Sequence, residues 1–296
     1  MSNKLKGVGT AIVTPFHKDG TIDFKSLQKL VEYQIKGNVN FLVVLGTTGE
    51  SVTLNKDEKT AVANFVVETV AGRVPVVLGL GGNNTQEVVN AIKNTDLEGI
   101  SAILSVSPYY NKPQQRGIFL HYKTIANNCP LPVIIYNVPG RTGGNISAET
   151  TLKIANEIEN VIGIKEASGN LSQCMKILKN RPADFLVLSG DDALTLPLMA
   201  LGADGVISVV SNAFPSEFSE MVQLCSKGNF KKAQEIHYKL IRIIDALFEE
   251  GSPGGIKAVL EIKKICNNYF RLPIVGVSKA HYNNIATLLE EFSSQN

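Results

Sequence analysis

Eight short apolar runs, each long enough for one buried strand, recur along the 296-residue chain and constrain its fold more than any other feature. Their starting positions are 20 to 33 residues apart, and most runs are continuously apolar, which is typical of parallel strands that are covered on both faces. The runs are GTAIVTP (9–15), FLVVLG (41–46), VPVVLGLG (74–81), ISAILSVSP (100–108), LPVIIYNV (131–138), VIGIKEAS (161–168), FLVLSGD (185–191) and GVISVVS (205–211).

The segments between these runs carry helix signals. Asn55 is followed three residues later by Glu58, the spacing of a capping box, and Ser147 stands where a helix N-cap is expected. After the sixth run, Cys174 and Met175 belong to an apolar repeat with helical spacing, so we expect both to face a core. Each strand is therefore predicted to be followed by a helix.

Eight strand–helix units predict an α/β protein with a (β/α)₈ TIM barrel, whose usual size is about 250 residues. An open doubly wound sheet is the alternative, but it normally has fewer strands and a glycine-rich turn after the first strand, which GTAIVTPF lacks. We predict a barrel over residues 1–226 and a helical C-terminal extension over residues 227–296, where no further strand is expected.

Composition narrows the possible functions. A formal net charge of +2 gives no basic field for nucleic acid or an anionic membrane, and no apolar stretch is long enough for a signal peptide or a membrane span. Cys129, Cys174, Cys225 and Cys266 lie far apart without CxxC pairing, which indicates free thiols rather than disulfides or a zinc site. We therefore expect a cytoplasmic protein.

Polar residues gather at the ends of the predicted strands, which in such a barrel form the active face. These residues are Thr47, Thr48, Glu50, Tyr109, Tyr110, Tyr136, Arg141, Lys165, Glu166, Asp191 and Asp192. Lys165 is the most unusual, because it ends an apolar strand where an unpaired ammonium costs several kcal/mol to bury. A desolvated amine readily loses its proton and becomes a nucleophile. The alternative is a solvated lysine at a strand end.

For several other positions, both a structural and a functional interpretation remain open. Tyr136 is either a reactive phenol or a core residue, and Arg141 is either a ligand for an anion or a solvated side chain in a loop. GLGGNN (79–84) lacks the third glycine of a phosphate loop, and GSPGGIK (251–257) is most simply a loop and a helix start. Two adjacent aspartates, at 191 and 192, have no third ligand nearby in the sequence, so we expect no metal site.

The motifs GTTGES, SPYYNKP, YNVPGRTG, GIKEASG and SGDD occur in this order on the predicted barrel. In this arrangement the chain resembles the pyruvate-dependent class I aldolases of the N-acetylneuraminate lyase superfamily, from Gly7 to about Leu272. GxTGE and the strand-borne lysine mark the superfamily. The arginine of YNVPGRTG makes the chain more similar to the dihydrodipicolinate synthase branch, since lyases that act on sialic acid lack it there.

This resemblance implies an enzyme that condenses pyruvate with L-aspartate 4-semialdehyde to give 4-hydroxy-tetrahydrodipicolinate, the first committed step of diaminopimelate and lysine biosynthesis. It implies a covalent imine on Lys165 and no cofactor. Tyr136, Thr48 and Tyr110 would form a proton relay, in which Tyr110 enters the site of a neighbouring subunit. The alternatives are another Schiff-base aldolase, one that acts on a sugar acid, and a non-catalytic barrel that binds a 2-oxo acid.

The resemblance also assigns substrate contacts. Backbone N–H groups of Thr47 and Thr48 would hold the pyruvate carboxylate, and Arg141 would hold the carboxylate of the semialdehyde. Gly190 and Ile207 would contribute backbone contacts beside the imine. A long polyhydroxy substrate would instead require hydroxyl-binding side chains in the loop of Arg141, so this residue distinguishes the synthase from a sugar-acid aldolase.

The resemblance also implies a homo-oligomer, with a dimer required for the catalytic site and a tetramer expected. It further implies an allosteric lysine site at the dimer interface, formed here by Ser51, Lys56, Lys59, Asn83, Glu87 and Tyr109. Lys56 and Lys59 stand where lysine-sensitive members carry histidines. A lysine side chain offers only donors and a positive charge, so we expect weak binding of free lysine.

Overall fold

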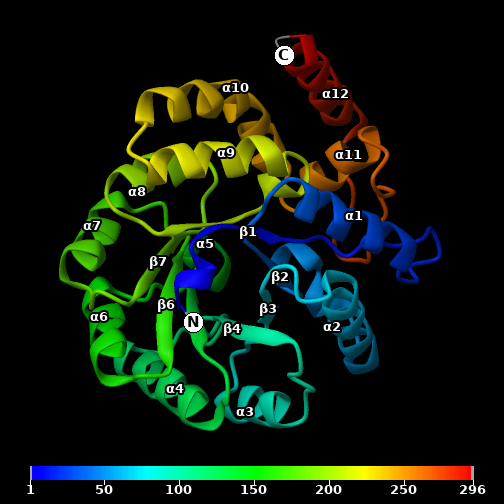
Figure 1. Cartoon of the computed structure of the whole chain (residues 1–296). Coiled ribbons are helices and arrows are strands. Elements are labelled where there is room, and N and C mark those ends of the chain that lie inside the picture. Colours follow the sequence, from blue (N-terminus) through cyan, green and yellow to red (C-terminus); the bar gives the residue numbers. More distant parts are fainter. Residues whose placement is uncertain (1, 295–296) are drawn as a thin grey trace.

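The computed structural model describes residues 2–294, and in it eight parallel strands close into a barrel in which β1 pairs with both β2 and β8 (Figure 1). The strands are β1 (Gly7–Ala11), β2 (Phe41–Val44), β3 (Val76–Gly79), β4 (Ile100–Val106), β5 (Val133–Asn137), β6 (Val161–Glu166), β7 (Leu186–Ser189) and β8 (Gly205–Ser208). The predicted (β/α)₈ barrel is confirmed.

All eight predicted strands are present, but each ends earlier than expected, and the bounds of the first differ most. β1 begins two residues earlier than expected, at Gly7, and it ends at Ala11 rather than at Pro15. The physical reason is that the N–H of Val13 donates to the side chain of Asn212, at 3.1 Å, instead of to a neighbouring strand. The apolar run continues beyond the sheet because Ile12 and Val13 are still buried.

Helices follow the strands, and the longer ones form the outer ring of Figure 1, whereas the one-turn helix α5 lies inside it. They are α1 (Phe24–Lys36), α2 (Lys56–Val70), α3 (Thr85–Lys93), α4 (Gln115–Asn128), α5 (Pro139–Thr142), α6 (Ala148–Glu157), α7 (Leu171–Asn180), α8 (Thr195–Ala200) and α9 (Pro215–Ser226), with the short turns η1 (Ser2–Leu5), η2 (Thr47–Gly49), η3 (Ser51–Thr53) and η4 (Val210–Asn212). The Asn55–Glu58 capping box and the Ser147 N-cap are confirmed. Met175 was placed wrongly in the core, because its position on α7 leaves it 45% exposed.

Two hydrophobic clusters separate the outside of the barrel wall from its interior. The larger cluster lies between the strands and the helices, and the smaller one fills the barrel. Ile164 belongs to the outer cluster, so the next residue of β6, Lys165, points inward. At the N-terminal end, Leu5 of η1 is fully buried within the interior cluster and closes that end of the barrel.

The chain continues beyond α9 as α10 (Phe230–Glu249), α11 (Gly254–Ile262) and α12 (Lys279–Ser294). α10 packs against α8 and α9, and α11 and α12 pack against α10 (Figure 1). Side chains of this extension, such as Leu240 and Leu260, share the outer hydrophobic cluster with the barrel. The division at residue 226 stays a prediction. Within residues 2–294, no helix is long and apolar enough to cross a membrane.

Candidate active site

β5 and β6 bring Tyr136 and Lys165 together, because these two residues are direct partners in the strand register. Both side chains are largely buried, with 7% of Tyr136 and 5% of Lys165 exposed. The Nζ atom of Lys165 lies 4.4 Å from the centre of the Tyr136 ring. The lysine is therefore held inside the barrel wall against a phenol, as the sequence indicated, rather than solvated.

Gly190, just after β7, lies directly against the Lys165 side chain. A Cβ atom at this position would be 3.0 Å from Cε and 3.1 Å from Cγ of Lys165, and 2.6 Å from Cβ of Ala167. A larger residue would therefore displace the amine. Ile207 of β8 is 1% exposed and belongs to the same interior cluster as Tyr136.

The turn that follows β2 is bounded by two residues with left-handed backbone, Leu45 (φ 58°) and Glu50 (φ 51°). Between them, the residues of η2 expose Thr47 and bury Thr48. The hydroxyl of Thr14 donates to the carbonyl of Gly49 at 2.6 Å, which ties the turn to the end of β1. As the first N–H groups of a helical turn, those of Thr47 and Thr48 have no acceptor within it.

Arg141 does not lie in an irregular loop as expected, because α5 forms a single helical turn over Pro139–Thr142. Its side chain is exposed. Its Nη2 atom donates to the carbonyl of Ser252, in the segment between α10 and α11, at 3.4 Å. The guanidinium therefore stands at the entrance of the barrel and keeps most of its donors available.

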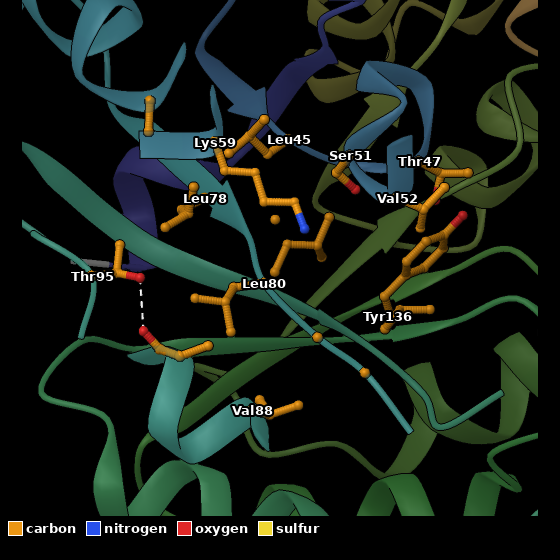
Figure 2. Close-up of a pocket in the computed structure, with 18 of the residues that line it drawn as sticks. Leu45, Thr47, Ser51, Val52, Lys59, Leu78, Leu80, Val88, Thr95 and Tyr136 are labelled. Atoms are coloured by element: carbon orange, nitrogen blue, oxygen red, sulfur yellow. Dashed lines mark hydrogen bonds between the residues drawn. The ribbon is translucent and has the colours of Figure 1, made fainter. Parts of the chain in front are cut away.

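A cavity of about 840 Å³ opens at this end of the barrel. Residues expected in the catalytic site and residues expected in the allosteric site both line it: Thr47, Tyr136, Arg141 and Lys165, together with Ser51, Lys56, Lys59, Asn83, Glu87 and Tyr109. Figure 2 shows the hydroxyl end of Tyr136 directed toward Thr47 and Val52, and the amine of Lys59 directed into the cavity. The two expected sites are thus parts of one continuous space.

Four predicted site residues are not among those that line this cavity: Thr48, Gly190, Ile207 and Tyr110. Tyr110 lies furthest out. Its side chain is 89% exposed, and its backbone has the left-handed φ of 71°. Its N–H donates to the carbonyl of Thr142 at 3.3 Å, which holds the residue at the rim next to α5. The phenol is therefore solvent-exposed in its own chain and does not line the cavity that contains Lys165.

The carboxylates of Glu166 and Asp192 are buried beside the cavity and are not among the residues that line it. Glu166 accepts hydrogen bonds from the side chains of Asn137 and Gln173 and from the N–H of Ser168. Asp192 accepts from the hydroxyl of Ser208 at 2.5 Å and from the N–H of Val209 at 3.1 Å. In residues 2–294, no group of three or more histidine, cysteine or acidic side chains is arranged to hold a metal.

Burial raises the pKa of the Asp192 carboxyl to about 6 and outweighs the bonds from Ser208 and Val209, which lower it. Neighbouring Asp191 raises this pKa further, and the charge of Lys165 lowers it. The charge of Lys165 is thus the smallest of these influences, and the closest partners of Asp192 are Ser208 and Val209.

Residues 4–292 match the Dihydrodipicolinate synthetase family. The chain belongs to this family. It is 52% identical over 289 residues to a 4-hydroxy-tetrahydrodipicolinate synthase of Parabacteroides distasonis, with 98% of this chain and 97% of that protein covered.

The crystal structure of dihydrodipicolinate synthase from Thermotoga maritima is similar with a TM-score of 0.95 at 42% identity, covering 97% of this chain and 98% of that one. The chloride-inhibited dihydrodipicolinate synthase from Acinetobacter baumannii, complexed with pyruvate, has a TM-score of 0.95 at 37% identity, covering 98% and 99%.

Membership of the dihydrodipicolinate synthetase family confirms the resemblance that the five motifs indicated, and it confirms that the chain is an enzyme. Sequence reasoning placed Glu50 at the active face but missed its partner. That partner is Lys257, which is 207 residues further along the chain in a segment interpreted only as a loop and helix start. No local pattern links residues so distant, although a lysine in an otherwise apolar helix start was a visible signal.

Proposed function

We propose that the chain is a lyase that condenses pyruvate with L-aspartate 4-semialdehyde to give 4-hydroxy-tetrahydrodipicolinate, through a Schiff base on Lys165. The observation that carries this proposal is a lysine amine held inside the barrel, 4.4 Å from the centre of a phenol ring and beside a cavity of about 840 Å³. The relatives' names and the pyruvate in the A. baumannii structure support the choice of substrate.

The neutral amine of Lys165 adds to the ketone carbon of pyruvate, and loss of water from the carbinolamine gives an iminium ion. The iminium withdraws electrons, so the methyl group loses a proton and becomes an enamine nucleophile. This carbon adds to the aldehyde of the semialdehyde, whose oxygen takes up a proton. The substrate's amino group then attacks the imine carbon, which closes the ring and releases Lys165. Since the imine itself is the electron sink, the reaction requires no cofactor.

Tyr136 is the proton carrier in this scheme, because its ring lies against Lys165. Thr48 is buried in the turn after β2, and its hydroxyl would connect Tyr136 to the next member of the proton relay. Tyr110 would complete the relay from a neighbouring subunit, in agreement with its exposure at the rim of its own chain. The active unit would then be a homodimer, and two dimers would form the tetramer.

The substrates' carboxylates have separate binding groups in this proposal. The N–H groups of Thr47 and Thr48 hold pyruvate, with backbone groups of Gly190 and Ile207 beside the imine. Arg141 holds the semialdehyde carboxylate, because its planar donor fork suits a carboxylate and it lies at the cavity entrance.

Trapping the imine tests the proposal. Incubation of the pure protein with pyruvate and borohydride should add one pyruvate-derived group per chain, located on Lys165 by peptide mass spectrometry. An assay with pyruvate and aspartate semialdehyde should then show formation of the cyclic product. Trapping at a different lysine, or turnover by a Lys165→Ala protein, would refute the assignment.

A further inference from the structure

The cavity is supported from outside by a second buried lysine, Lys257 of α11. Its side chain is 0% exposed, and its amine donates to the Glu50 carboxylate at 2.5 Å and to the carbonyl of Tyr269 at 2.9 Å. The rings of Phe16 and Phe270 lie against the same amine, at 4.4 and 4.8 Å. Burial lowers the pKa of this amine, and the Glu50 charge opposes that shift.

A second cation of the extension reaches the same region. Arg271 forms a bidentate pair with Glu58 at the start of α2, at 2.6 and 2.8 Å, and donates to the carbonyls of Thr53 and Gly20. Its backbone N–H also approaches the other oxygen of Glu50, at 3.4 Å. The C-terminal extension thus holds both ends of the segment that runs from Glu50 to the start of α2.

The segment that these contacts hold includes the end of the turn that faces the cavity. Glu50 ends η2, and its N–H donates to the carbonyl of Thr47 at 3.1 Å. Its left-handed backbone is unfavourable for a residue other than glycine, so tertiary contacts must hold it. The side chain of Glu50 makes those contacts with the extension.

We propose that Lys257 is a positioning residue for the pyruvate carboxylate: through Glu50 it sets the orientation of the Thr47–Thr48 turn whose N–H groups receive that carboxylate. This inference rests on the proposed function. Lys257 does not line the cavity, so it acts only through the turn. Stability alone is a poor reason for such a pair, because well-packed apolar residues often replace a buried ion pair without loss.

The test is a titration of imine trapping with pyruvate in a Lys257→Met protein, at a temperature well below its melting point. The pyruvate concentration for half-maximal trapping should rise about ten- to hundredfold, as expected for a displaced binding group. At saturating pyruvate, the KM for the semialdehyde should change by less than about twofold. Equal effects on both substrates, or none on pyruvate, would overturn the proposal.

A control variant removes a second ion pair, one that is largely buried and lies far from the turn. Arg181 pairs with Asp204, which precedes β8 at the opposite end of the barrel. Arg181→Met should lower the melting temperature and leave half-maximal trapping unchanged. A shift like that of Lys257→Met would mean that general destabilisation, rather than the turn, weakens pyruvate binding.

The double variant Lys257→Met/Glu50→Gln separates positioning from stability, because it leaves no unpaired buried charge. Its melting temperature should recover toward that of the unaltered protein, while its half-maximal trapping stays shifted. Recovery of both would overturn the proposal. If Lys257→Met does not fold, Glu50→Gln alone, which keeps an acceptor for Lys257, is titrated in the same way. A raised pyruvate concentration for half-maximal trapping supports the proposal, and an unchanged one overturns it. Absence of trapping in the unaltered protein would instead refute the proposed function.

Discussion

Lys165 and Lys257 are both buried, and each amine lies 4.4 Å from the centre of an aromatic ring, yet their surroundings differ. Lys257 has the carboxylate of Glu50 and a backbone carbonyl as acceptors. For Lys165, residues 2–294 provide no ion-pair partner, and its amine faces the cavity.

The difference teaches that burial alone does not make a lysine reactive. The amine of Lys257 is held as a donor to Glu50 and to the carbonyl of Tyr269, and it does not line the cavity, so it cannot reach a ketone there. An unpaired amine at a cavity is the form that can react. Pairing, which no single sequence motif reveals, therefore separates the lysine proposed for chemistry from the lysine proposed for positioning.

The contrast between Lys165 and Lys257 would be wrong if Lys165 were needed for folding. Lys165→Met should abolish borohydride trapping of pyruvate and reduce turnover by at least about a thousandfold, since the covalent step has no other nucleophile. Its melting temperature should stay equal or rise, because an unpaired buried amine is replaced by an apolar side chain. Lys257→Met should show the opposite, with trapping at saturating pyruvate retained and the melting temperature lowered. Calorimetry and mass spectrometry on both variants provide the check.

Arg141 extends the comparison to a cation that faces the cavity without a carboxylate partner in the described part of the chain. Arg141→Ala should leave pyruvate trapping nearly intact and weaken use of the semialdehyde. Loss of a charge-assisted pair to a carboxylate costs about 2–5 kcal/mol, or roughly thirty- to several-thousandfold in kcat/KM. Steady-state kinetics with each substrate varied in turn measures this effect. A parallel loss in trapping would show that Arg141 supports the fold instead.

Lys56 and Lys59 are a third kind of lysine, exposed and lining the far part of the cavity. Two unit charges about 4 Å apart repel by about 4 kcal/mol at an effective dielectric constant of 20. Even a screened fraction of this repulsion should weaken binding of free lysine by about tenfold or more. We expect millimolar lysine to leave the enzyme largely uninhibited at neutral pH. Half-inhibition below one millimolar would show that both amines turn away from the effector.

Asp192 supplies the smallest test, because burial shifts its pKa and the charge of Lys165 affects that pKa only slightly. Its folded-state pKa of about 6 lies above the ordinary value of 3.8, so the unfolded chain releases a proton first as pH rises. The contribution of Asp192 to stability is therefore full below pH 3.8 and is lost as pH rises through 6. Melting curves from pH 4 to 7 should show Asp192→Asn gaining a few degrees relative to the unaltered protein. Parallel curves would indicate that the carboxyl is ionised throughout.

The sequence was sufficient to predict the barrel, because eight buried strands leave periodic apolar runs that survive errors of a few residues at each end. It was also sufficient to predict that Tyr136 and Lys165 lie together at one end of the barrel, since parallel strands bring their ends together. Lys165 and Tyr136 were found in this way. The proposed roles of Lys165 and Tyr136 come from the motifs, and the structure shows which residues surround them.

Contacts between distant segments could not be predicted in the same way. Glu50 was expected at the mouth of the barrel, but its pairing with Lys257 depends on how α11 packs, which no local spacing encodes. Met175 shows the same limit. It is an apolar residue on the exposed side of α7, and the sequence does not reveal where the surface that covers this helix ends. The bounds of β1 were set by a side chain of Asn212, about 200 residues away.

Leu5 closes the N-terminal end of the barrel, and this has a kinetic consequence. With one end sealed, pyruvate, the semialdehyde, water and the cyclic product all pass through the mouth that contains Arg141. Two substrates that enter through the same opening obstruct each other unless the first is bound away from that opening. In the proposed mechanism, attachment to Lys165 would hold pyruvate away from the opening, so we expect the enzyme to bind its substrates in a fixed order, pyruvate first.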